Sequence, residues 1–134
     1  MNSLSPMKPL GVELMDADHA RLDRLFDSVA HAGDDMLAVL FEEMRDEMAA
    51  HFAREEAMMQ ACAVPVLPCH AEMHEKLLAQ FDAGRRFVEA DDFIGLRIHL
   101  GSAAPHLVAH HVETADTVAA GFITGDPSAF TCAG

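Results

Sequence analysis

Four segments of the chain carry apolar side chains at intervals of three and four residues, which is the spacing of one face of an α-helix. The same segments are rich in Ala, Leu, Met, Glu and Arg and show little of the alternation typical of β-strands. Helix breakers separate them at Pro6 and Pro9, at Gly33, at Pro65 and Pro68, at Asp91 and Asp92, and at Gly125. Short connections make consecutive helices antiparallel neighbours, so the sequence predicts an all-α, up-down-up-down antiparallel four-helix bundle.

Each segment is expected to form one helix with one buried face. In the first two segments this face runs from Val12 to Val29 and from Leu37 to Cys62. The third face runs from Leu67 to Val88, with Gly84 in one of its positions. The fourth is expected to comprise Leu96, Leu100, Ala103, Leu107, His111, Val118 and Phe122.

A chain of 134 residues has room for one domain of ordinary size. We expect this domain to span residues 11–124, after an N-terminal arm (1–10) and before a C-terminal tail (125–134). Apolar residues make up 51% of the chain, which is enough for a core that needs no disulfide. No apolar run approaches the roughly 20 residues that span a bilayer, which predicts a soluble protein.

The chain is strongly acidic, with 9 Lys and Arg against 22 Asp and Glu and a formal net charge of −13. Such a charge repels phosphate backbones and anionic lipid surfaces. We therefore expect neither nucleic acid nor a membrane as a partner.

The cysteines, Cys62, Cys69 and Cys132, are odd in number and have no finger-like spacing. This pattern favours reduced thiols in a cytosol over a disulfide framework. Residues 1–10 also lack the apolar stretch of a secretory signal. We therefore expect a cytoplasmic protein.

Several polar side chains occupy positions on the apolar faces: His19, His51, Glu55, His70, His74 and His111. Burying them without partners would cost a few kcal/mol each, against a total stability of about 5–15 kcal/mol. One buried His is usually satisfied by a hydrogen bond. A set of polar groups that converges from all four helices instead favours a metal site.

The spacing within two helices supports a metal site. His70 and His74 are four residues apart, so both imidazoles project from one face and can chelate one ion. His51 and Glu55 repeat this spacing on the preceding helix. The set holds more ligands than one tetrahedral ion can use, which favours two ions bridged by a carboxylate. Imidazole with carboxylate suits iron, and zinc, copper or manganese are also possible.

Four motifs follow one another along the chain: Met15-Asp16-Ala17-Asp18-His19, then His51-Phe52-x-x-Glu55-Glu56-x-x-Met59, then His70-x-x-x-His74, then His111 followed by Asp116. In this order they resemble hemerythrin, in particular its bacterial single-domain members, from about residue 10 to about residue 122. The resemblance implies two iron ions. His70, His74 and His111 would bind one of them, His19 and His51 the other, and Glu55 and Asp116 would bridge the two.

By the same resemblance, an oxo or hydroxo group also bridges the iron ions, and the iron with two His has an open position. Dioxygen binds there in the diferrous state and is held reversibly as hydroperoxide on a diferric pair. The resemblance thus implies a carrier, not an enzyme, that stores or delivers dioxygen. The apolar faces favour neither a monomer nor a homo-oligomer, and they point to no protein that receives the oxygen.

Two other functions are left open. The cluster could be an enzyme that reduces peroxide or nitric oxide or oxidises iron, or an oxygen or redox sensor. Against turnover, the chain has no Trp or Tyr that could relay electrons. Alternatively, the bundle could buffer zinc or mixed metals without oxygen chemistry.

The fourth segment contains one residue that conflicts with ideal helix geometry. Five residues rotate a straight α-helix by about 140°, which places Asp116 off the face that carries His111. Either the helix is locally widened there, or another group is the ligand. His110 competes with His111, but only His111 lies on the apolar face. We expect His99, His106 and His110 on a solvated face, and Glu56 beside the cluster or on the surface.

Overall fold

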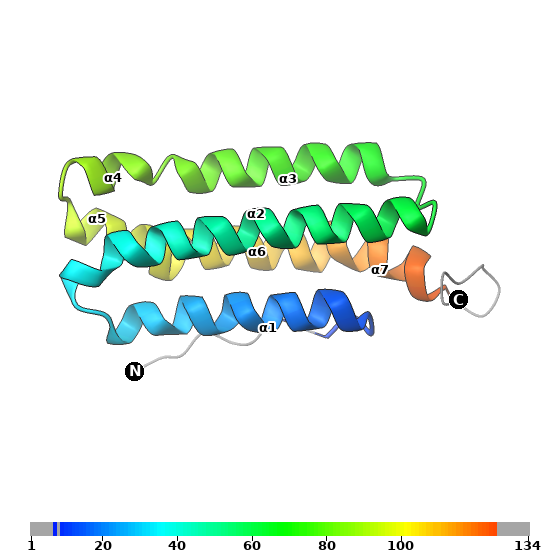
Figure 1. Ribbon diagram of the computed structural model, residues 1–134, viewed down its shortest axis with the longest axis horizontal. Helices are drawn as coiled ribbons and strands as arrows, with labels where there is room; N and C mark the ends of the chain where they lie inside the picture. The colour runs from blue at the N-terminus through cyan, green and yellow to red at the C-terminus, as the bar shows by residue number, and fades with distance from the viewer. Residues whose placement is uncertain (1–6, 8, 126–134) are drawn as a thin grey trace.

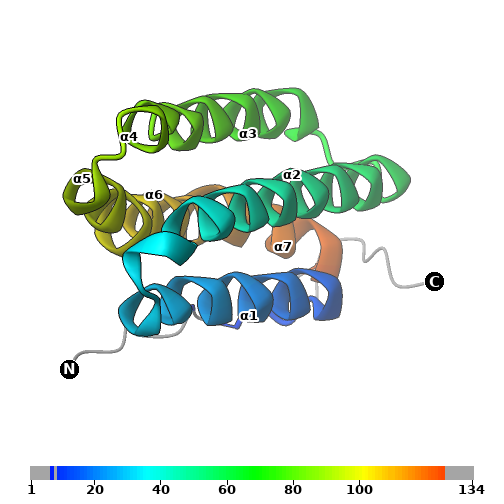
Figure 2. The same ribbon diagram turned by 60° about the vertical axis from the view of Figure 1, so that its left-hand side comes forward.

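The computed structural model describes residue 7 and residues 9–125, which form a bundle of four helical segments (Figure 1). The first is α1 (Glu13–Ser28), and the second is α2 (Leu37–Ala61). The third comprises α3 (Leu67–Asp82) and the short α4 (Arg85–Glu89), and the fourth comprises α5 (Phe93–Ile98), α6 (Ala104–His111) and α7 (Thr117–Thr124). Consecutive segments run antiparallel, as Figure 2 also shows, so the predicted all-α four-helix bundle is confirmed.

The third segment is interrupted, contrary to the single helix that we predicted there. The helix α3 ends at Asp82, and a turn at Ala83 and Gly84 precedes α4. A second break separates α4 from α5 at Asp92, whose side chain accepts a hydrogen bond from the backbone N–H of Gly95 at 2.9 Å. This contact caps the first turn of α5.

Two apolar clusters fill the bundle, one on each side of a layer of polar side chains. The larger is centred on Leu22, Phe41, Phe81 and Leu100. The smaller includes Met15, Met59 and Ala119. In each segment the buried polar residues lie near the point where residues of one cluster give way to those of the other, so the polar layer crosses the middle of the core.

The fourth segment contains two widened turns of π-helix, at His99–Ala103 and at Val112–Asp116. The first lies just before Pro105, which has no N–H to donate and whose ring would clash with the carbonyl four residues earlier. The second ends at Asp116. A π-turn pairs residues five apart, so it brings Asp116 back to the face of His111.

The widened turns also shift the apolar face that we predicted for this segment. Each adds a residue to one turn and so rotates everything after it by roughly 100°. As a result Ala103 is exposed and Val118 is 51% exposed, while Ala104, Val108 and Ala119 are buried. The prediction was therefore wrong for Ala103 and Val118, although it was right for Leu96, Leu100 and His111.

Several expectations concern the ends of the chain and its thiols. Most of the expected arm, the tail beyond Gly125, and Cys132 lie outside the described residues, and the domain boundaries stay a prediction. Cys69 is a free, exposed thiol, whereas Cys62 is disulfide-bonded, so the expectation of reduced thiols is wrong for Cys62. Among the residues that the structure describes, no helix is both long enough and apolar enough to cross a membrane.

His99 is not on a solvated face, contrary to our expectation. Its ring lies against Phe81, with ring centroids 5.4 Å apart, and its Nε2 donates a hydrogen bond to the Phe81 carbonyl at 2.8 Å. Gly84 makes room for this ring, because a Cβ atom at Gly84 would overlap it. The glycine at the break in the third segment thus allows the first π-turn to pack closely.

We expect Gly84→Ala to destabilise the protein by about 1–3 kcal/mol, because the added methyl group forces the His99 ring out of its place. Gly121→Ala is the matched control, since Gly121 lies in α7 with no atom within 4 Å of an added Cβ. There alanine should stabilise the helix by about 0.5–1 kcal/mol. Urea unfolding measures both, and equal effects of the two substitutions would contradict this account.

Candidate metal centre

The buried polar layer brings together all seven residues that the sequence singled out as metal ligands. α1 supplies His19, α2 supplies His51 and Glu55, α3 supplies His70 and His74, and the fourth segment supplies His111 and Asp116. Each of the seven is at most 8% exposed. His110, the competitor of His111, is exposed on the surface.

The seven residues form two groups that overlap in two carboxylates. One group consists of His70, His74 and His111 with Glu55 and Asp116, and the other of His19 and His51 with the same two carboxylates. Within each group, one ligand atom per residue lies within 4.8 Å of every other. Two neighbouring ions that share Glu55 and Asp116 would use every member of the set.

All five imidazoles face the two shared carboxylates with Nε2. Around Glu55, the distances to a carboxylate oxygen are 2.6 Å from His70, 3.0 Å from His74 and 3.4 Å from His51. Around Asp116, they are 3.0 Å from His111 and 3.1 Å from both His19 and His70. The two carboxylates thus connect all four helical segments at one level.

Several of these atoms lie close together without forming hydrogen bonds. His74 Nε2, His111 Nε2, Glu55 Oε2 and Asp116 Oδ1 are buried and have no hydrogen-bond partner among the described residues. Unsatisfied polar atoms of this kind are costly unless something else satisfies them. Their lone pairs converge, and imidazole with carboxylate is a donor set that iron accepts, so the residues fit a pair of metal ions.

Two further carboxylates lie behind the imidazoles. Asp18 Oδ2 accepts a hydrogen bond from His51 Nδ1 at 3.0 Å, and Glu56 Oε2 accepts one from His74 Nδ1 at 2.7 Å. Such contacts fix the ring orientation of a ligating histidine. Glu56 therefore lies beside the cluster, one of the two places that we expected for it.

Sequence reasoning missed Asp18, which is completely buried. A signal was present, because Asp18 is three residues after Met15 and four before Leu22, on the edge of the apolar face of α1. The prediction used the neighbouring His19 as a candidate ligand and did not include Asp18.

Electrostatics differ sharply between the ligands of the metal-free protein. For His70, burial opposes protonation, but the nearby carboxylates of Asp116 and Glu55 outweigh it and raise the pKa to about 9. For His74, burial together with the nearby His70 and His111 lowers the pKa to about 4. Burial also lowers the pKa of His51.

The two shared carboxylates behave oppositely. Burial and the nearby charge of Asp116 raise the pKa of Glu55. Burial would raise the pKa of Asp116 as well, but the close Nε2 atoms of His111, His19 and His70 hold it below its usual value. Asp116 is therefore the more firmly ionised of the two, and it faces Nε2 of His70 at 3.1 Å.

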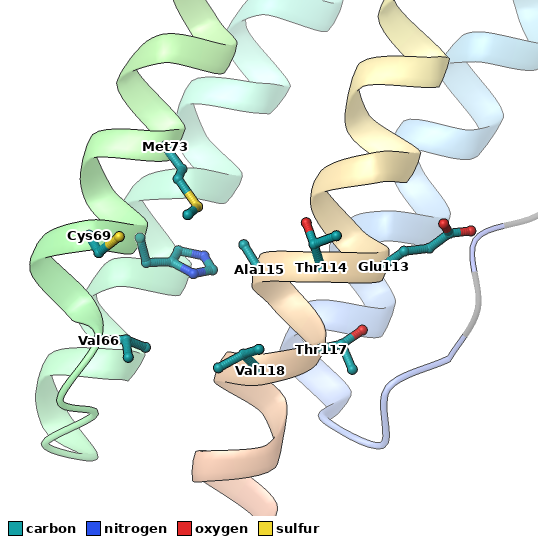
Figure 3. Close-up of a pocket in the computed structure, with 9 residues that line it drawn as sticks. Val66, Cys69, Met73, Glu113, Thr114, Ala115, Thr117 and Val118 are labelled. Carbon is teal, nitrogen blue, oxygen red and sulfur yellow. The ribbon is translucent and has the colours of Figure 1, made fainter.

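A surface cavity of about 460 Å³ adjoins the cluster between α3 and the second π-turn with α7 (Figure 3). Cys69 and Met73 line it from α3, and Ala115 and Val118 line it from the other side. His70 is also among the residues that line it. One imidazole of the cluster is thus reached from a mainly apolar hollow.

Comparison with known proteins identifies the family. The family model described as "Hemerythrin HHE cation binding domain" matches residues 10–122. The chain belongs to the hemerythrin family. A curated relative from Ralstonia nicotianae named "Bacteriohemerythrin" is 32% identical over 108 residues, which cover 80% of this chain and 77% of the relative. No solved structure matches the chain.

The raised pKa of His70 predicts how the stability of this hemerythrin-family chain depends on pH when no metal is bound. A His whose pKa rises from 6.5 to about 9 on folding stabilises the fold fully below pH 6.5, and this stabilisation is lost as the pH rises through 9. The urea concentration at the midpoint of unfolding of the metal-free protein should therefore decrease as the pH is raised from 6.5 to 9. His70→Gln, which binds no proton, should flatten this fall. An equally steep fall in the variant would contradict the prediction.

Proposed function

We propose that the protein binds dioxygen reversibly at a non-heme di-iron centre, as a carrier that stores or delivers it and not as an enzyme. One observation supports this most strongly: five imidazoles share only two carboxylates and divide three to two between the halves of the cluster. The division matches the ligand set implied by the resemblance. In this proposal the ligands are His19, His51, Glu55, His70, His74, His111 and Asp116.

An iron pair held by these residues would supply two electrons that reduce dioxygen on binding and that return when dioxygen leaves. The chain's own residues determine how the pair is held. Glu55 and Asp116 offer two oxygens each and lie between the two groups of imidazoles, which is where bridging ligands have to be. The half with His19 and His51 has one protein ligand fewer, so it would leave room for dioxygen.

The surroundings of the cluster favour reversible binding because they are apolar. The Phe52 ring stacks on the His74 ring at 4.0 Å between centroids, and Met15 and Met59 are fully buried on the other side of the polar layer. Such side chains exclude bulk water, which would otherwise supply protons and promote loss of the bound oxygen in reduced form. The neutral imidazoles also donate less charge to the ions than carboxylates would.

Iron content and visible spectra test the proposal directly. The protein is reduced, exposed to oxygen, and then purged of oxygen again, with a spectrum at each stage. We expect two irons per chain and an absorption band that appears with oxygen and fades when oxygen is removed. Two irons that oxidise irreversibly would favour an enzyme or a redox sensor instead, and zinc in place of iron would favour a metal buffer.

We expect His74→Ala to lose iron, because it removes a nitrogen that lies 3.0 Å from Glu55 in the three-histidine half of the cluster. It should also lower stability, since Glu56 loses its buried partner. Elemental analysis and thermal unfolding measure the two effects. His110→Ala is the control, because His110 is exposed and lies outside both ligand groups. Full iron content and an unchanged spectrum in His74→Ala would exclude His74 as a ligand.

A further inference from the structure

Asp18 lies directly behind the ring of His51, on the side away from the cluster. Its Oδ2 accepts a hydrogen bond from Nδ1 of that ring at 3.0 Å. The other nitrogen, Nε2, lies 3.4 Å from Glu55 Oε2. Because a neutral imidazole carries one proton, a proton held on Nδ1 leaves the lone pair of Nε2 directed into the cluster.

Asp18 is in turn held by two arginines. Arg54 donates to both of its oxygens, from Nε at 3.1 Å and from Nη2 at 2.8 Å, in a fork that fixes the plane of the carboxylate. Arg21 also donates to Oδ1. Both arginines contact Glu47 as well, at 2.9 Å from Arg54 and 3.4 Å from Arg21. Because both of its oxygens accept hydrogen bonds from arginines, Asp18 stays ionised and has no proton to donate. In its contact with His51 it is therefore the acceptor.

Among the described residues, neither His74 nor His19 has an equivalent support. Glu56 contacts Nδ1 of His74, but this carboxylate is 34% exposed, against 0% for Asp18. Nδ1 of His19, the partner of His51 in the same ligand group, is buried without a hydrogen bond from any described residue. The ring of His51 is therefore the one whose orientation is most completely determined from behind.

We propose that Asp18, clamped by Arg54 and Arg21, is a positioning residue that holds His51 in the Nδ1–H form with Nε2 aimed at the ion shared with His19. The proposal rests on the proposed function for the assignment of the two ions. Since Asp18 acts through His51, its loss should weaken the ion of the two-histidine half selectively. Outer contacts of this kind typically contribute 10- to 100-fold to metal affinity.

A purely structural role would give a different result. In that case Asp18 would only tie α1 to α2, and its loss would lower stability without changing the ring nitrogens of His51. The chain offers a comparison, because Arg45 and Asp82 tie α2 to α3 through a similar fork at 3.2 and 3.4 Å. Neither of them contacts a histidine among the residues described.

The test uses Asp18→Asn, which keeps the shape of the side chain but allows it to accept from Nδ1 or to donate to it. Nitrogen-15 NMR of the histidine rings in metal-free protein at pH 8 should show one tautomer of His51 in the wild type and a mixture in the variant. Titration with cobalt(II) alone, followed by its visible absorption, should show two ions in the wild type. One of the two should bind 10- to 100-fold more weakly in the variant.

Matched variants separate positioning from stability. Arg54→Lys keeps the charge but loses the fork, so it should show a smaller effect of the same kind, whereas Arg45→Lys should change neither the His51 tautomer nor cobalt binding. Glu56→Gln should leave the His51 nitrogens unchanged. An Asp18→Asn protein with a single His51 tautomer and wild-type affinity for both ions would overturn the proposal.

Failure of the proposed function would look different. If wild-type protein bound two cobalt ions and iron but showed no reversible oxygen spectrum, the oxygen-carrier proposal would fail while the role of Asp18 stood. If Asp18→Asn changed neither readout in a protein that binds oxygen reversibly, the role of Asp18 would fail while the carrier proposal stood.

Discussion

The bundle depends on the attraction between five imidazoles and two carboxylates that are buried between apolar clusters. Each of these groups would be costly to bury alone, and together their cost would exceed the stability of an ordinary domain. Asp116 contacts His19, His70 and His111 from three different segments. The contacts that offset the cost of burying these groups therefore also fix the positions of the helices along the bundle axis relative to one another.

A regular helix could not supply the second shared carboxylate. Asp116 reaches the cluster only because the turn before it is widened, and widening leaves backbone groups without their usual helical partners. Thr117 offsets part of this cost, because its hydroxyl donates to the carbonyl of Val112 at 2.8 Å. The widened turn thus lies where it brings a ligand to the cluster, which is typical of π-turns at functional sites.

The fold and the candidate ligands were predictable to the extent that they follow helical periodicity. The spacing of His51 with Glu55 and of His70 with His74 predicted their shared faces, and the structure places all four together. Periodicity failed after each π-turn, so Val118 was expected in the core and is exposed. Periodicity also does not predict long-range contacts, since no residue near Asp18 in the sequence indicates that Arg54 of α2 donates to both of its oxygens.

The two carboxylates behind the imidazoles differ in what they can contribute. Arg54 and Arg21 balance the charge of Asp18 and Glu47, so this group adds little net charge to the cluster and acts mainly by direction. Glu56 has no arginine partner among the described residues and is partly exposed, so it adds negative charge behind the three-histidine half. Two metal ions in the cluster would bring more positive charge than Glu55 and Asp116 cancel, and Glu56 would offset part of the remainder in the three-histidine half. The half with three imidazoles thus gains charge compensation from Glu56, while the half with His19 and His51 gains a fixed ring geometry from Asp18.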